Sequence, residues 1–348
     1  MSAGMLVFRL GDLSVRMRWK ALLANTGLAA LLLVLAGWAL TVGSRAIDVQ
    51  SVVRWMVFHD LGATDALILG DFRAPRICLA MLAGAMLALA GAVTQYQTRN
   101  GLADPSLLGV REGASLFIVA LLLVSPAMPL ALRPVVGLAG GLAAGLAVAL
   151  VSRGASPLKF VMTGFGISWC LSSMLVILLA SADLTSLQSA LLWLAGSLQA
   201  ADWQSVRIAA VILVFAGSVI FWLARHTELD DMGEAVATVL GTARSGPRRS
   251  TLMCAVLLVA GSVSVVGGLG FVGLIAPHIA RFLPRQSLRG QLVASMMIGA
   301  LLVLAADTLG RTIFAPVTLP AGISLAAIGA PLLVLLLWLR RDRTEDLR

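Results

Sequence analysis

The sequence predicts an all-α, polytopic integral membrane protein with about ten transmembrane helices and both termini in the cytoplasm. Three observations support this fold class. Of the 348 residues, 59% are hydrophobic and only 12% are charged. Long apolar runs follow one another through almost the whole chain, and a bilayer core needs about 20 apolar residues per helix. The basic residues gather in every second gap between these runs, as expected for loops that face the cytoplasm.

Each predicted span is an apolar run bounded by polar or turn-forming residues. The eighth run is short and follows Gly267, Gly268 and Gly270, which is typical of a broken or half-length helix beside a cavity. The ten predicted spans are 21–43, 76–96, 107–125, 134–152, 160–181, 204–224, 251–268, 271–284, 291–310 and 321–339.

These spans predict one transmembrane domain over residues 21–339, with a cytoplasmic polar segment at 225–250 inside it. Residues 1–20 form a cytoplasmic N-terminal segment and 340–348 a cytoplasmic tail. The start of the chain does not read as a cleavable signal peptide, because its first apolar run is too long. Of the 26 lysines and arginines, seven fall on the outer side, at Arg45, Arg54, Arg73, Arg76, Arg133, Arg207 and Arg311.

The net charge of +9 is explained by this topology, so no nucleic-acid partner is predicted. Cys78, Cys170 and Cys254 all fall within apolar runs, which argues against a disulfide framework or a metal site. The chain is also not expected to be an enzyme. It has no GxxxxGK[ST] phosphate loop, because Lys20 and Lys159 are followed by Ala21 and Phe160.

Small residues recur at helical spacing in two of the predicted spans. Gly137, Gly141 and Gly145 share one face of the fourth span. Gly84, Ala88 and Ala92 do the same in the second. Small residues let helix backbones approach closely in lipid, so both faces predict close helix packing.

Arg73 and Arg76 flank Pro75 at the outer start of the second span, and Arg311 lies at the outer end of the ninth. They are either anchors at the headgroups or an exposed positive ridge that faces a carboxylate-bearing partner. Asp307 and His278 lie within spans, where ionisable residues often serve ion-coupled carriers. We favour hydrogen-bonded structural roles for both, and a proton-coupled secondary carrier stays the alternative from another class.

Two inner segments carry further motifs. The loop Thr98–Val110 contains Asn100 and Leu102, which either form a plain turn or narrow a pathway at the inner mouth of the bundle. The segment Met232–Gly241 reads as a short amphipathic helix that Gly241 ends. Acidic residues around it make docking into a partner groove a better interpretation than lying on an anionic membrane.

Five motifs in this order resemble the FecCD-type permeases, the membrane subunits of type II ABC importers for ferric siderophores, haem and cobalamin. The motifs are RxPR at 73–76, RNxLADPxLLGVxxGA from Arg99, GExxAxxLG from Gly233, GFVGLIAPHIAR at 270–281 and LPxGxxxxxxGAP from Leu319. The resemblance implies ten helices per subunit and two permease subunits around one path. It also implies two cytoplasmic ATP-binding subunits and a periplasmic binding protein.

The resemblance also implies roles for individual residues. Arg73, Arg76 and Arg311 would dock the binding protein. Asn100, Leu102 and Ser156, the last in the loop Ala155–Lys159, would form the inner gate. The coupling to the ATPase would involve Met232, Gly233, Glu234, Ala235, Leu240 and Gly241. The structural signature of the family would comprise Pro277, His278, Arg281, Asp307, Pro320 and Gly322.

Three places depart from the family pattern. Gly101 stands where proline is usual, Arg111 and Glu112 replace small or polar residues, and Thr242–Pro247 differs after the coupling helix.

The predicted function is therefore that of an ABC importer permease subunit that moves a ferric siderophore by alternating access. A cobalamin or haem importer of the same family is the alternative substrate assignment, and a non-transporting scaffold is a further rival. The second, fifth, eighth and tenth spans are expected to line the path. We expect no metal or cofactor in this chain, with ATP and magnesium on the partner ATPase. The predicted location is the bacterial inner membrane, in contact with lipid.

Overall fold

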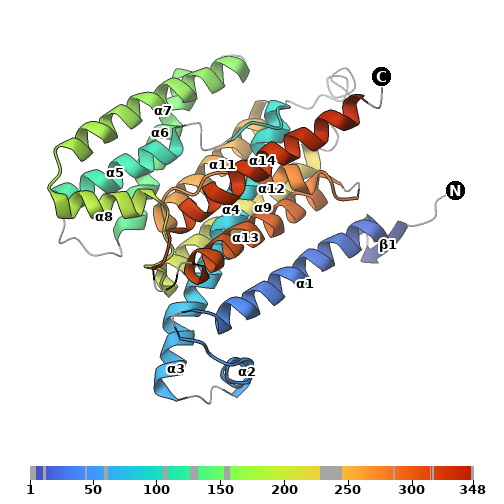
Figure 1. The fold of residues 1–348 in the computed structure, drawn as a ribbon. Coiled ribbons are helices and arrows are strands. Elements are labelled where there is room, and N and C mark those ends of the chain that lie inside the picture. The colour runs from blue at the N-terminus through green and yellow to red at the C-terminus, as the bar shows by residue number, and fades with distance from the viewer. Residues whose placement is uncertain are drawn as a thin grey trace.

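Long helices make up most of the computed structural model, which confirms the predicted all-α class (Figure 1). It describes residues 5–10, 13–43, 45–58, 62–104, 109–125, 132–152, 157–227, 245–284, 287–313, 315 and 317–345. One small antiparallel sheet, of β1 (Met5–Leu10) and β2 (Leu13–Arg18), precedes the first long helix and was not predicted. The alternation of Leu13, Val15 and Met17 with polar residues is the sequence signal for it.

Every predicted span coincides with a helix. Within the described residues, seven helical stretches are long and apolar enough to cross a bilayer. The helices α5, α12 and the apolar part of α14 are shorter than this, so the count of ten crossings stays a prediction. The ten helices are α1 (Trp19–Thr41), α4 (Ala74–Thr98), α5 (Val110–Val124), α6 (Arg133–Val151), α7 (Pro157–Ala180), α9 (Trp203–Thr227), α11 (Ser245–Val266), α12 (Val272–Ala280), α13 (Leu288–Thr312) and α14 (Ala321–Glu345).

Shorter helices that the sequence did not predict occupy two of the connections that are predicted to lie on the outer side. Between α1 and α4 lie α2 (Val49–Phe58), α3 (Ala63–Leu67) and the π-helix η1 (Ile68–Arg73), which runs directly into α4. Between α7 and α9 lies α8 (Leu184–Leu194). Asp183 caps the N-terminus of α8, and hydrogen bonds from Thr185 and Ser186 hold the pKa of Asp183 well below its ordinary value.

The two ends of the described chain lie at the same end of the helix bundle. Figure 1 shows the N-terminal sheet and the C-terminal end of α14 at one end, with α2 and α3 at the opposite end. This arrangement agrees with an even number of crossings. That both termini face the cytoplasm stays a prediction.

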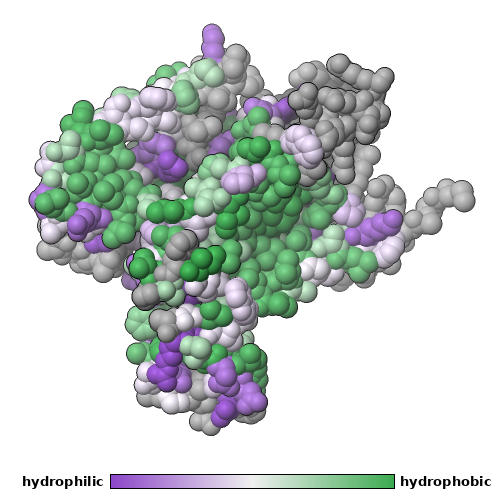
Figure 2. Space-filling model, viewed as in Figure 1, coloured by the Kyte–Doolittle hydropathy of each residue, from purple (hydrophilic) through white to green (hydrophobic). Residues whose placement is uncertain are grey.

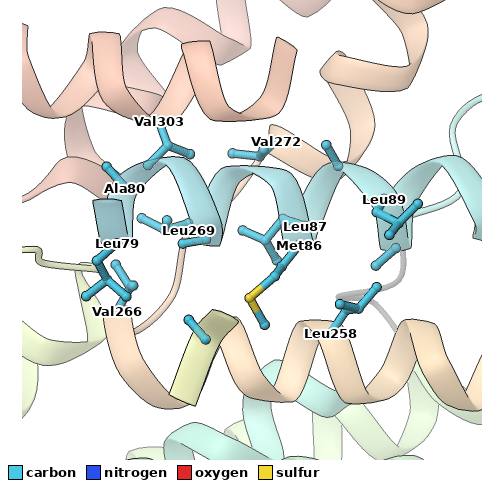
Figure 3. Packing of buried hydrophobic residues seen from close by; sticks show 14 of the residues in the cluster. Leu79, Ala80, Met86, Leu87, Leu89, Leu258, Val266, Leu269, Val272 and Val303 are labelled. Atoms are coloured by element: carbon cyan, nitrogen blue, oxygen red, sulfur yellow. The ribbon is translucent and has the colours of Figure 1, made fainter. Parts of the chain in front are cut away.

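The helix α4 forms the centre of the bundle. It is buried along most of its length and packs against α9, α11, α12 and α13. Figure 3 shows Leu79, Met86 and Leu89 of α4 close to side chains of these neighbours, such as Leu258 and Val303. On the face shown in Figure 2, by contrast, exposed hydrophobic side chains cover much of the bundle. Such a surface is unfavourable in water and is typical of a protein surrounded by lipid.

Small residues let pairs of helices approach closely, as predicted. A Cβ atom on Gly84 of α4 would lie 2.2 Å from the carbonyl oxygen of Gly299 in α13. The three glycines of α6 pack just as tightly, mainly against α11. A Cβ atom on Gly137 would lie 2.6 Å from Ile118 and 3.0 Å from Ser264. Cβ atoms on Gly141 and Gly145 would lie 2.7 Å from Ala260 and 2.5 Å from Val256, respectively. Both predicted small-residue faces are therefore packing faces.

The chain breaks between α11 and α12, as the glycines of this stretch predicted. Gly267 has a φ of +80°, and Phe271, which precedes α12, has a φ of +67°. The helix that follows has nine residues, Val272–Ala280, and is too short to cross a bilayer alone. A half-length helix therefore begins inside the bundle.

Candidate functional site

The outer arginines surround one buried carboxylate and the nearby end of α1. Arg76 of α4 forms a bidentate contact with Asp307 of α13, with Nη2 2.7 Å from Oδ1 and Nε 3.0 Å from Oδ2. Arg311, one turn after Asp307, places Nε 3.3 Å from the same Oδ2. The Asp307 side chain is fully buried, with 0% exposure. Asp307 is thus the shared counter-charge of two arginines.

Arg73 meets the C-terminal end of α1 instead. Its guanidinium donates to the carbonyl oxygen of Leu40, in the last turn of α1, and to that of Arg45, four residues after α1 ends. Arg311 adds a 3.4 Å hydrogen bond to the carbonyl oxygen of Val42. Carbonyl groups at a helix C-terminus have no partner within the helix and carry a partial negative charge, so arginines satisfy them well. These contacts join α1, η1 and α13.

The prediction that these arginines form an exposed ridge is wrong. Arg73 is only 6% exposed, and the side chains of Arg76 and Arg311 are also largely buried. The reason is that Asp307 and the carbonyl oxygens at the end of α1 draw the guanidinium groups inward. Docking of a binding protein by these residues stays a prediction.

In the inner loop, Asn100 forms a turn. Arg99 ends α4 with a φ of +51°, and the Asn100 side-chain oxygen accepts a 3.0 Å hydrogen bond from the backbone N–H of Leu102. This is the local side-chain turn that asparagine favours. Leu102 is exposed. The turn interpretation is confirmed, while a gating role for Asn100 and Leu102 stays a prediction.

The signature in α12 is built around a proline. Pro277 has no N–H, so the carbonyl of Gly273, four residues earlier, has no helical partner. Gln95 of α4 satisfies it: its Nε2 lies 3.4 Å from the Gly273 oxygen and 3.1 Å from the Leu274 oxygen. The Gln95 Oε1 atom in turn accepts a 3.1 Å hydrogen bond from Arg281. Gln95 therefore joins α4 to both ends of α12.

His278 is buried in α12, and its ring centroid lies 5.8 Å from that of Phe282. Beside this region, a cavity of about 290 Å³ opens between α4, α12 and α13. Its lining residues are Ala92, Tyr96, Pro277, Arg281, Leu288, Gln291 and Leu292.

Pro320 and Gly322 position the start of α14. The Pro320 carbonyl accepts hydrogen bonds from Ile323 and Ser324, and the Gly322 N–H donates to the Gly196 carbonyl at 3.0 Å. A Cβ atom on Gly322 would lie 2.1 Å from the Ala195 carbonyl oxygen, so the position requires glycine. The segment that follows α8 is therefore joined directly to the start of α14.

Several predicted site residues lie outside the described part of the chain. These are Ser156 of the inner gate and the coupling residues Met232, Gly233, Glu234, Ala235, Leu240 and Gly241. Their roles stay predictions. Sequence reasoning missed Gln95, although a glutamine near the end of a long apolar run is a visible signal.

Comparisons with known proteins agree on the family. The model of the FecCD transport family matches residues 30–339. The probable siderophore transport system permease protein YfhA of Bacillus subtilis (strain 168) is 37% identical over 334 residues, which cover 93% of this chain and 96% of that protein. The Fe(3+) dicitrate transport system permease protein FecD of Escherichia coli (strain K12) is 37% identical over 270 residues, with coverages of 78% and 85%.

A solved structure has a similar fold over most of this chain. It is described as an inward-facing conformation of a metal-chelate type ABC transporter, and it superposes with a TM-score of 0.81 at 27% identity. The match covers 90% of this chain and 98% of that one. Together with the family match over residues 30–339, this shows that the chain belongs to the FecCD transport family.

Proposed function

We propose that this protein is the membrane permease subunit of an ABC importer that moves a ferric siderophore across the bacterial inner membrane. The observation that carries the proposal is the match to the FecCD family over nearly the whole chain, together with the similarity to a siderophore permease. The shared fold with a metal-chelate ABC transporter supports it.

In this proposal the energy comes from partners. Two separate ATP-binding subunits hold ATP and magnesium, and a periplasmic binding protein delivers the chelate. A second permease subunit, either a homologue or a second copy of this chain, completes the path. ATP binding moves the coupling segment at 228–241, and the helices then alternate between inward- and outward-open arrangements.

The proposal assigns the docking of the binding protein to the end of the bundle opposite the described termini. Arg73, Arg76 and Arg311 lie there, and Asp307 pairs with Arg76 and Arg311 only, so this group carries excess positive charge. Acidic groups on a binding protein would complement that charge. Asn100, Leu102 and Ser156 are proposed as the inner gate.

The burial of Asp307 counts against the proton-coupled carrier. A proton relay needs a carboxylate that changes its charge during transport. Asp307 is instead fully buried and paired with Arg76 and Arg311, so it serves as a structural counter-charge.

The test is iron uptake by proteoliposomes that contain the chain, its partner permease and the ATPase. Uptake of 55Fe-siderophore should require both ATP and the binding protein. Substitution of Glu234 or deletion of 232–241 should abolish ATPase co-purification or uncouple it. Uptake driven by a proton gradient with neither helper present would overturn the proposal, while uptake of haem or cobalamin alone would change only its substrate.

A further inference from the structure

Arg111 lies near the middle of the membrane-spanning bundle. It belongs to the first turn of α5, and two contacts place that turn. A Cβ atom on Gly141, near the centre of α6, would lie 3.2 Å from the Val110 carbonyl oxygen. A Cβ atom on Gly109 would lie 3.5 Å from the backbone nitrogen of Ser168, near the centre of α7. The helix α5 therefore begins halfway along its neighbours.

An arginine at this depth needs an explanation, because charged side chains inside a bilayer are costly and usually functional. The ion pair that Arg111 makes does not provide one. Its Nε lies 3.4 Å from Oε1 of Glu112, the next residue in the chain. A pair between sequence neighbours joins no two helices, so it does not hold the fold together.

The exposed charge at this point is positive. The Arg111 side chain is 44% exposed, whereas that of Glu112 is 15% exposed. Arg111 also lies against the break between α11 and α12, because a Cβ atom on Gly268 would lie 3.6 Å from its Cδ. The half-length helix α12 begins four residues later, at Val272. Arg111 itself lies in the first turn of α5, and the N-terminus of a helix carries a partial positive charge.

We propose that Arg111 contacts the substrate at the centre of the transport path and favours a ferric chelate of net negative charge with free carboxylate oxygens. A guanidinium has five N–H donors, and the pair with Glu112 accounts for one of them. The remaining edge suits a carboxylate, which it binds in a bidentate manner. A neutral chelate gains nothing from this contact. This inference rests on the proposed function and narrows its substrate class.

The experiment measures chelate binding to the assembled complex of both permease subunits and the ATPase, in lipid nanodiscs without nucleotide or binding protein. The probes are 55Fe-dicitrate, which is anionic, and a neutral ferric trihydroxamate. Arg111→Gln should weaken dicitrate binding by about tenfold or more, the range expected for lost charged hydrogen bonds. It should leave trihydroxamate binding within about twofold. Arg111→Lys should retain part of the dicitrate affinity, because it keeps the charge.

Arg207→Gln is the matched control, since Arg207 is an exposed arginine of α9 and should affect neither probe. Glu112→Gln should leave dicitrate binding unchanged or tighter, because it releases the guanidinium. The inference is overturned if Arg111→Gln binds both chelates as the wild type does, or loses both equally. A different result would overturn the proposed function itself: the wild-type complex would then transport no ferric chelate even with ATP and its binding protein.

Discussion

Arg76 and Asp307 are 231 residues apart in the chain, yet their side chains form a bidentate ion pair with contacts of 2.7 and 3.0 Å. The pair joins the central helix α4 to α13. Arg311 shares the same carboxylate, so one buried charge serves two arginines. Asp307 is therefore the carboxylate that joins α4 to α13 at this end of the bundle.

Replacing that carboxylate should destabilise the protein. Asp307→Asn keeps the shape but leaves Arg76 and Arg311 without a counter-charge, which should cost about 3 kcal/mol of unfolding free energy. Thermal unfolding in detergent measures it. Asp65→Asn is the control: Asp65 pairs with the exposed Arg45, and its loss should cost less than about 1 kcal/mol. Equal melting temperatures for both variants would contradict the assigned role.

Substitution of Arg73 distinguishes a role in docking the binding protein from a role in supporting α1. Arg73→Gln removes the charge while keeping polar donors for the carbonyl oxygens of Leu40 and Arg45. If docking holds, the affinity for the binding protein should fall by about tenfold while the melting temperature changes little. A lower melting temperature with unchanged affinity would show that Arg73 only supports α1.

Gln95 and Pro277 should be energetically coupled. Gln95→Leu leaves the Gly273 carbonyl unpaired in the protein interior, at a cost of about 1–3 kcal/mol. Pro277→Ala restores an N–H that can donate to the same carbonyl within α12. The double variant should therefore lose less stability than Gln95→Leu alone. A double-mutant cycle of melting measurements tests this, and simple additivity would refute the coupling.

The contact between Gly84 and Gly299 should not tolerate a methyl group. Gly84→Ala would place Cβ 2.2 Å from the Gly299 carbonyl oxygen, so α4 and α13 must move apart. We expect a loss of about 1–3 kcal/mol, visible as a lower melting temperature. A Cβ atom on Gly37 of α1 would have nothing within 4 Å, so Gly37→Ala is the matched control and should not destabilise. Tolerance of both substitutions would disprove the close approach.

Two substitutions of Asn100 should distinguish a role in the turn alone from a role in the inner gate. Asn100→Asp keeps the oxygen that accepts from the Leu102 N–H, so uptake should stay near the wild-type rate. Asn100→Trp should slow uptake of the chelate by the reconstituted complex, while the ATPase still co-purifies. Wild-type uptake by the tryptophan variant would remove Asn100 from the gate.

Much of the fold was predictable from local patterns. Apolar run lengths located all ten predicted helices, and the glycines at 267–270 marked the break before α12. The helix α8 was missed because it is shorter than a span, and a search for spans alone passes over it. The site was only partly predictable. The motif RxPR and Asp307 were visible, but nothing local shows that they pair.

What the sequence by itself determined is the class of protein, the positions of the ten predicted helices and the family, because each depends on composition, period or motif within a short window. Only the tertiary structure decided that the outer arginines turn inward to Asp307 and α1, that Gln95 completes the helix that Pro277 interrupts, and that Arg111 lies at mid-bundle. These are contacts between segments that are distant in the sequence. The packing of the helices decides which side chain lies near a buried charge or an unpaired carbonyl, so no local pattern predicts the partner.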